Sequence, residues 1–341
     1  MSIVMTGGGT GGHLVIIKAV KEQLKGEQLI YIGSTAGQDR QWFGEDDDFA
    51  STYFLETRGV VNQGLTGKIK SLMMLFRATR EAMRLLDKHH AKVVFSVGGF
   101  SAAATSFAAR LKGIPLVIHE QNAALGSLNK MLKSSAAAFV SSYLEESPIH
   151  AYPIKSIFFE QAHIRSRVKK IIFLGGSQGA QAINELALSL APKLKEKGIG
   201  IIHQAGEKNI DKVRKNYSAL GVEAEVFGFT THLADLMNEA DFAVARAGAS
   251  TLWELSAAGL PALFIPYPYA AGDHQYYNAK FLTDKGLAWL MRGGGEWFKN
   301  MGVEGSGGEK LFSMSGHLNN PGNFEVPMGI PFKELLEMAG G

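Results

Sequence analysis

Glycine-rich segments provide the clearest candidates for phosphate binding in this chain. The first, residues 7–14 (GGGTGGHL), follows a short apolar run and places Thr10 and His13 at the start of an expected helix. Glycines let backbone N–H groups approach a phosphate at a helix N-terminus, and a histidine beside that point could act as a base. The alternative is a tight strand-to-helix turn that leaves His13 facing solvent.

Two later segments extend this chemistry. Residues 175–180 (GGSQGA) repeat the glycine loop and offer Ser177 to a bound anion. Residues 246–268 place a Gly-Ala-Ser-Thr stretch before a helix that contains Glu254. The start of that helix could bind a diphosphate, and Glu254 could accept hydrogen bonds from two ribose hydroxyls. The alternative makes Glu254 an ordinary exposed helix residue.

Sugar recognition and sugar transfer need few further groups. Residues 273–279 (DHQYYNA) supply Gln275 and Asn278, whose amides could read sugar hydroxyls. An inverting transfer requires a base for the attacking hydroxyl and stabilisation of the departing diphosphate, which helix N-termini and backbone donors can provide. The acidic run at residues 46–48 indicates a solvated loop rather than a metal site. We therefore expect no metal.

The elements that would position these residues alternate between apolar strands and helical stretches. Two strand–glycine–helix units about 165 residues apart predict two doubly wound domains that face each other across a cleft. Pro148 and Pro153 place the linker near residues 147–156. Expected strands lie at 3–5, 28–32, 93–97, 116–119, 171–174, 200–204, 224–227, 242–245 and 262–266, and expected helices at 14–25 and 182–197.

Composition excludes several classes of function. The chain has 341 residues, of which 46% are hydrophobic and 20% charged, so it is long and apolar enough for two globular domains. It contains no cysteine, which excludes disulfides and thiolate metal sites. Its net charge of +3 is too small to indicate a nucleic-acid partner. No long uncharged apolar run or leader pattern is evident, so we expect a cytoplasmic protein.

Six motifs together resemble the MurG family of glycosyltransferases in their order and spacing. The resemblance covers about residues 1–291. It implies an α/β fold of the GT-B type, with two Rossmann-like doubly wound domains across a cleft. It also implies inverting, metal-independent transfer of N-acetylglucosamine from UDP-N-acetylglucosamine to lipid I, giving lipid II for peptidoglycan, without a cofactor. The motifs are GGGTGGH, GGF (98–100), HEQN (119–122), GGSQGAQAIN (175–184), RAGASTLWE (246–254) and DHQYYNA.

The same resemblance implies roles for individual residues. His13 is the expected acceptor-side base, and Glu120 is a second catalytic candidate in the cleft. Lys155 stands where the family often has an arginine, which would alter a contact with the donor diphosphate. The residues expected to bind the donor, with Thr230 near the uracil, are Thr10, Gly11, Gly12, Asn122, Ser177, Thr230, Ala249, Ser250, Thr251, Leu252, Trp253, Glu254 and Gln275.

One stretch could contact a membrane. Residues 65–86 (LTGKIKSLMMLFRATREAMRLL) combine large apolar side chains with Lys68, Lys70, Arg77 and Arg80. Such a helix could rest on anionic lipid, or it could simply bury its apolar face in the domain. Because the acceptor of the resembled family carries a polyprenyl chain, the resemblance favours peripheral contact with the cytoplasmic face of the bacterial inner membrane.

The chain departs from the resembled family after about Arg292. Residues 315–326 (SGHLNNPGNFEV) resemble part of the NADH-binding flavoprotein subunit of respiratory complex I, without that family's cofactor loops or cluster cysteines. We expect strands near 310–315 and 324–326, a turn between them and a short helix at 332–338. The predicted domains are thus 1–150 (acceptor and membrane), 151–291 (UDP-sugar) and 292–341 (a small α+β tail of foreign appearance).

Other functions remain open at this point. Another GT-B lipid glycosyltransferase or a UDP-sugar epimerase would share the nucleotide-binding segments but should lack HEQN and GGF at this spacing. A dehydrogenase is supported by the tail alone. In the resembled fold the last helices complete the second domain, so the altered tail could also leave a chimeric protein that binds a UDP-sugar without transferring it.

Overall fold

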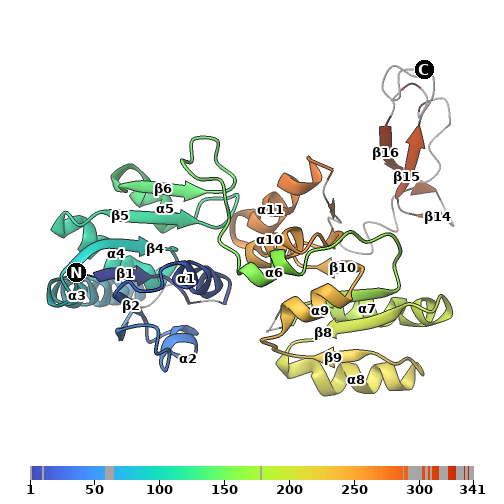
Figure 1. Cartoon of the computed structure of the whole chain (residues 1–341), viewed down its shortest axis with the longest axis horizontal. Helices are drawn as coiled ribbons and strands as arrows, with labels where there is room; N and C mark the ends of the chain where they lie inside the picture. The colour runs from blue at the N-terminus through green and yellow to red at the C-terminus, as the bar shows by residue number, and fades with distance from the viewer. Residues whose placement is uncertain are drawn as a thin grey trace.

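Two parallel sheets organise the molecule, one in each half (Figure 1). The strand order is β3-β2-β1-β4-β5-β6 in the first sheet and β12-β11-β10-β7-β8-β9 in the second. This confirms the predicted pair of doubly wound α/β units. The computed structural model describes residues 2–9, 11–57, 65–176, 179–286 and 288–290, and from the tail 302–303, 306–307, 309–314, 322–327, 334 and 337.

In the first half, β1 lies at the centre of its sheet and pairs in parallel with β2 and β4. The strand order reverses beside β1, and ligands of doubly wound sheets bind at such a point, beyond the carboxyl ends of the strands. The strands are β1 (Ser2–Thr6), β2 (Leu29–Ser34), β3 (Ser51–Leu55), β4 (Ala91–Ser96), β5 (Leu116–Glu120) and β6 (Ala138–Ser141). The helices are α1 (Gly11–Gln23), α2 (Asp39–Phe43), α3 (Leu65–Lys88), η1 (Phe100–Ala102), α4 (Ala103–Lys112), α5 (Ser127–Leu132) and η2 (Lys133–Ser135).

The second half repeats this plan around β7, which pairs in parallel with β10 and β8. Its strands are β7 (Lys170–Leu174), β8 (Gly200–Gln204), β9 (Glu225–Phe227), β10 (Phe242–Ala245), β11 (Ala262–Phe264) and β12 (Trp289–Leu290). Its helices are α6 (Ser156–Glu160), α7 (Gln181–Glu196), η3 (Glu207–Asn209), α8 (Ile210–Ala219), α9 (Leu233–Glu239), α10 (Ala249–Ala257), η4 (Ala271–Asp273) and α11 (His274–Thr283).

Central strands are buried on both faces because helices cover both sides of each sheet. All six residues of β2 are buried, as expected for an inner parallel strand. On one face Ile30 and Ile32 pack with Ala78 and Ala82 of α3. On the other face Tyr31 joins a second cluster with α1. The apolar cores therefore fix the carboxyl ends of the strands, where the glycine loops begin.

The structure differs from the sequence prediction at the sheet edges and at one helix start. Strands β3, β6 and β12 were not predicted; the first two mix polar and apolar residues, and β12 has two residues. Helix α1 begins at Gly11, earlier than the expected position 14, so both Gly11 and Gly12 belong to its first turn. The predicted linker segment lies between β6 and α6.

The tail contains short antiparallel strands: β13 (Gly302–Val303), β14 (Ser306–Gly307), β15 (Glu309–Met314) and β16 (Gly322–Pro327). Strands β15 and β16 pair from Glu309 opposite Pro327 to Met314 opposite Gly322, which confirms the predicted hairpin. The helix expected at 332–338 falls mostly outside the described residues.

Candidate functional site

The first glycine loop is held by a buried carboxylate that the sequence analysis missed. Asp39 Oδ2 accepts the Gly9 N–H at 2.7 Å. Its Oδ1 accepts the Tyr31 hydroxyl at 2.9 Å, the Ser34 N–H at 3.1 Å and the Ser101 hydroxyl. Gly9 has φ of 85°, and a Cβ there would lie 2.5 Å from the Phe100 ring. The loop therefore needs both its glycines and Asp39 to keep its shape.

Asp39→Asn should destabilise the protein by about 2–4 kcal/mol, because the amide would turn an N–H group toward donors that now face a buried carboxylate. Urea unfolding followed by circular dichroism measures this change. Asp47→Asn is the matched control, since Asp47 is exposed and its replacement should change stability by less than about 0.5 kcal/mol. Equal stability of the two variants would contradict the bracing role of Asp39.

His13 lies in the first turn of α1 and is half-buried. Its Nε2 is 2.5 Å from Gln121 Nε2, so the ring is oriented by the loop that follows β5. Burial lowers the pKa of His13 to about 4, while Asp39 acts in the opposite direction and His274 adds to the lowering. The imidazole is thus neutral near pH 7 and able to accept a proton. Because the ring is half-buried and contacts Gln121, His13 does not lie freely in solvent, and its role as base stays a prediction.

Glu120 ends β5 and is buried. Its Oε1 accepts the Asn122 N–H at 3.0 Å, and its Oε2 accepts the Gly126 N–H and the Asn129 side-chain N–H, both at 2.9 Å. Both oxygens are therefore engaged by the loop that carries Gln121 and Asn122. This geometry favours a positioning role for Glu120 over direct proton transfer.

The same loop joins the two halves of the molecule. Asn122 Oδ1 accepts a hydrogen bond from Asn278 Nδ2 at 3.1 Å, and Asn278 Oδ1 accepts the Ala123 N–H at 2.8 Å. Asn278 Nδ2 also donates to the Ala247 carbonyl at 3.2 Å. Both polar atoms of the Asn278 amide are therefore hydrogen-bonded at the junction between the two halves, and not directed at a sugar as the sequence analysis expected.

Helix α10 meets α1 at this junction. The Ser250 hydroxyl donates to the Gly12 carbonyl at 3.0 Å. Trp253 Nε1 donates to the Tyr143 hydroxyl at 3.0 Å, and its indole stacks on Tyr152 with ring centres 5.6 Å apart. The side chains of Ala249 and Leu252 are buried, so only their backbone groups could contact a ligand. The side chain of Thr251 is partly exposed.

Glu254 is the least expected feature of α10. It is only 7% exposed, so the alternative of an ordinary surface residue is wrong. Burial raises the pKa of its carboxyl to about 7, and Lys155 partly offsets that rise. Among the described residues, neither a backbone nor a side-chain group donates a hydrogen bond to its carboxyl oxygens. A buried carboxylate without donors is ready for a ligand that brings hydroxyl groups.

Of the remaining predicted donor-binding residues, two make contacts near their own position in the chain and two lie outside the described residues. Thr230 Oγ1 accepts the His232 N–H at 3.0 Å within its own turn. Gln275 Oε1 accepts the Tyr267 N–H at 2.9 Å, which fixes the amide after β11. Thr10 and Ser177 lie outside the described residues.

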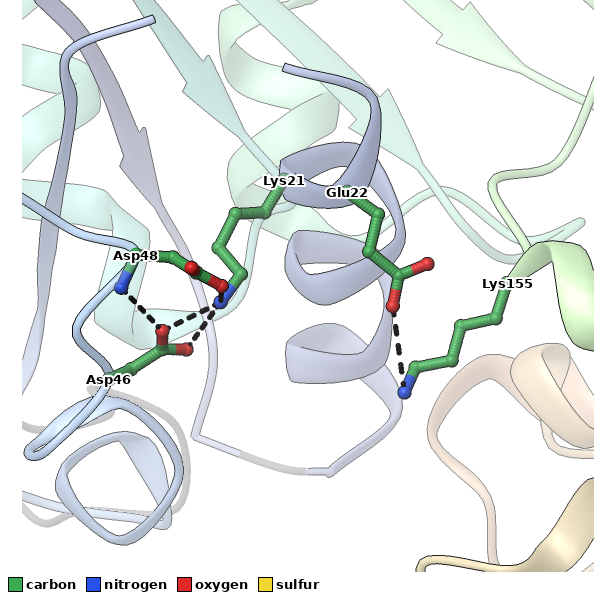
Figure 2. Close-up of polar contacts among 5 residues, drawn as sticks. All are labelled: Lys21, Glu22, Asp46, Asp48 and Lys155. Carbon is green, nitrogen blue, oxygen red and sulfur yellow. Dashed lines mark hydrogen bonds and ion pairs between the residues drawn. The ribbon is translucent and has the colours of Figure 1, made fainter. Parts of the chain in front are cut away.

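The acidic run at residues 46–48 is not wholly solvated, contrary to the prediction. Lys21 Nζ lies 2.6 Å from Asp46 Oδ1 and 2.6 Å from Asp48 Oδ2 (Figure 2). The Asp46 side chain is only 13% exposed, because it closes over the buried Lys21. Asp47 and Asp48 are exposed.

Comparison with known proteins agrees with this architecture. The glycosyltransferase family 28 N-terminal domain matches residues 3–141, and the family 28 C-terminal domain matches residues 170–293. An SLBB domain matches residues 311–341.

Individual relatives cover most of the chain. A UDP-N-acetylglucosamine–N-acetylmuramyl-(pentapeptide) pyrophosphoryl-undecaprenol N-acetylglucosamine transferase of Sulfurovum sp. (strain NBC37-1) is 73% identical over 86% of this chain and 87% of its own. The protein of the same name from Wolinella succinogenes is 55% identical over 86% and 88%. The crystal structure of Acinetobacter baumannii MurG matches with a TM-score of 0.69 and 31% identity over 85% of this chain and 86% of that one. The chain therefore belongs to the MurG-type glycosyltransferases of family 28 and has their GT-B fold.

Proposed function

We propose that this chain transfers N-acetylglucosamine from UDP-N-acetylglucosamine to lipid I, giving lipid II at the cytoplasmic face of the bacterial inner membrane. The family assignment supports the reaction. The observation that carries the site proposal is the meeting of α1 and α10, which brings His13, the first glycine loop and the buried Glu254 to one junction.

In this proposal the acceptor hydroxyl attacks the anomeric carbon of the sugar as His13 takes its proton. The bond between that carbon and the diphosphate oxygen breaks, and UDP leaves with the bonding electrons. His13 is neutral in the unliganded protein, and the negative charge of a bound diphosphate would raise its pKa toward the working pH, where a base is most effective. Backbone N–H groups at the starts of α1 and α10 stabilise the negative charge that develops on the diphosphate.

Each part of the donor has a proposed partner. Glu254 accepts the ribose hydroxyls, Thr230 lies near the uracil, and Gln275 and Asn122 contact the sugar. Thr10, Gly11, Gly12 and Ser177 belong to the glycine loops around the phosphates. Glu120 acts by holding the loop that carries Asn122 and Gln121. A metal-independent reaction stays a prediction.

Donor calorimetry tests the proposed specificity. UDP-N-acetylglucosamine should bind at least about tenfold more tightly than UDP-glucose, because amides that lose the acetamido partner stay unpaired. Equal affinity for the two sugars would contradict the proposed sugar contacts. An absence of binding to either would contradict the donor site.

Helix α3 supports a membrane contact. One stripe of this helix is buried and contains Ala78, Ala82 and Leu86. A second stripe exposes Leu72, Met73 and Phe76, with exposed fractions of 55–64%. Large exposed apolar side chains in one cluster mark a surface that binds another apolar phase.

Basic side chains continue from this apolar cluster along α3. A surface groove there is lined by Arg77, Arg80 and Arg84, together with Glu81 and Leu85. We propose that this face rests on anionic lipid, with the arginines near phosphate headgroups. Within the described ranges, none of the helices has the length and apolar character needed to cross a bilayer.

Replacing Leu72 and Phe76 together by serine should weaken binding to phosphatidylglycerol vesicles by about a hundredfold or more, because each buried apolar side chain contributes about 1.5–3 kcal/mol. Vesicle sedimentation measures the change. Leu220→Ser is the control, since Leu220 is 44% exposed in the second half of the molecule. Unchanged partition of the double variant would rule out this surface.

A further inference from the structure

Lys18 occupies an unusual position on α1. Its side chain is half-buried, and its ammonium lies 4.8 Å from the centre of the Trp42 ring. Trp42 also borders the glycine loop, because a Cβ built on Gly11 would lie 3.5 Å from its ring. Residues 11, 18 and 22 share one helix face at spacings of seven and four. Lys18 is thus held beside the first turn of α1 by an aromatic platform.

Lys21, on the same helix, has the carboxylate partners that Lys18 lacks. Lys21 sits between Asp46 and Asp48, both 2.6 Å away (Figure 2). For Lys18, no carboxylate oxygen comes within 4.0 Å in the part of the chain that the structure describes. The attraction of an ammonium to an aromatic ring only partly replaces such a partner. Lys18 therefore carries a positive charge that its surroundings leave uncompensated at close range.

A second lysine approaches the same helix face from the other half of the molecule. Lys155, just before α6, reaches toward α1 and lies 3.7 Å from Glu22 Oε1 (Figure 2). Glu22 is one turn from Lys18. Burial is the main cause that lowers the pKa of Lys18; Lys155 adds to the lowering, and Asp46 and Glu22 act in the opposite direction. Lys155 also acts on the carboxyl of Glu254. The ammonium of Lys155, from the second half, thus lies near the face of α1 that carries Lys18 and Glu22.

Glu22 offsets part of the charge of Lys155, whereas Lys18 has no carboxylate oxygen within 4.0 Å among the described residues, so an anion beside both ammonium groups would lower their repulsion. The Trp42 ring lies next to Lys18, and the Phe229 ring from the second half, adjacent in sequence to Thr230, is 6.5 Å from it. A nucleoside diphosphate would bring negative charge between the lysines, with its base toward Thr230 and its ribose toward Glu254.

We propose that Lys18 is a further donor-binding residue, which together with Lys155 clamps the diphosphate of the UDP-sugar from both halves of the molecule. This inference rests on the proposed function. The second ammonium offsets the negative charge that UDP gains when the bond to the sugar breaks.

Calorimetry with two probes, UDP and uridine, tests the clamp in the full chain. Lys18→Met should raise the Kd for UDP by about tenfold and leave the Kd for uridine within about twofold, because only UDP carries the diphosphate. Lys18→Arg should keep most of the affinity. Lys25→Met is the control, since it removes one exposed charge near the far end of α1. Thermal melting checks that each variant is folded.

Other outcomes separate the two levels of inference. Wild-type protein that transfers sugar, together with a Lys18→Met variant of unchanged UDP affinity, would overturn the role of Lys18 alone. Equal losses of affinity for UDP and for uridine would also overturn it, because they would indicate a general disturbance of the donor site and not the loss of a contact with the diphosphate. If Lys18→Met fails to fold, a Kd of Lys18→Gln equal to that of wild type would overturn it too. Wild-type protein that binds no UDP would contradict the proposed function itself.

Discussion

Replacing His13 by alanine should lower the rate of sugar transfer by about a hundredfold to ten-thousandfold, the usual contribution of a positioned base. Donor affinity should stay within about twofold, because the imidazole acts on the acceptor hydroxyl. Transfer of labelled N-acetylglucosamine measures the rate, and calorimetry measures the affinity. His150→Ala is the control, since His150 is exposed in the linker segment. A His13→Ala variant with normal turnover would contradict the assignment of His13 as the base.

The pH dependence sharpens this prediction. His13 must be neutral to accept a proton, and burial lowers its pKa to about 4 in the unliganded protein. The value of kcat/KM should therefore stay level from pH 7 down to about 5 and fall as the pH drops through about 4, if the protein stays folded. Bound diphosphates favour the imidazolium, so the corresponding fall in kcat should occur at a higher pH. Two limbs that coincide near pH 6.5 would contradict the buried environment.

Removing the carboxyl of Glu254 should have the second large effect. Glu254→Ala should weaken UDP binding by about a hundredfold, because two hydrogen bonds from ribose hydroxyls to a charged group contribute about 1.5 kcal/mol or more each. Calorimetry with UDP and 2′-deoxy-UDP identifies the contact: wild type should discriminate between them, and the variant should not. Glu196→Ala, at an exposed position of α7, is the control.

Protonation gives an independent check on Glu254. Its pKa is raised to about 7, so the carboxylate that accepts both hydroxyls forms as the pH rises through that value. Affinity for UDP-N-acetylglucosamine, whose diphosphate does not titrate in this range, should increase from pH 6 to pH 8 in wild type, and this increase should vanish in Glu254→Ala. Bound ribose hydroxyls favour the carboxylate and should lower its pKa in the complex. A wild-type affinity that falls as the pH rises, with no such fall in Glu254→Ala, would contradict the proposed role of Glu254.

The fold was largely predictable because central parallel strands are apolar throughout. The apolar runs 29–32 and 171–174 stand out in the sequence, within the predicted strands 28–32 and 171–174, since helices cover both faces of their sheets. Strands β3 and β6 lie at sheet edges, where one side lacks a neighbouring strand and polar residues are tolerated. Their sequences therefore carry a weaker signal.

The site was predictable where its chemistry is local and not where it depends on tertiary contacts. A glycine loop followed by a helix start can be read from consecutive residues, as at His13 and Ser250. The bond from Gly9 to Asp39 spans 30 positions, and that from Asn278 to Asn122 spans 156. The burial of Glu254 likewise depends on the packing of α10. The contacts of Asp39 and Asn278 and the burial of Glu254 form only when the two sheets and their helices are assembled. The sequence alone therefore could not distinguish a buried Glu254 from an exposed one.

The most direct test is the transfer of labelled N-acetylglucosamine from its UDP donor to a lipid I analogue by the full chain, with donor binding measured on the same sample. The proposed function predicts turnover that depends on His13 and is unaffected by His150→Ala. Donor binding without transfer would contradict it and would indicate a chain in which the altered C-terminal segment has disabled the enzyme.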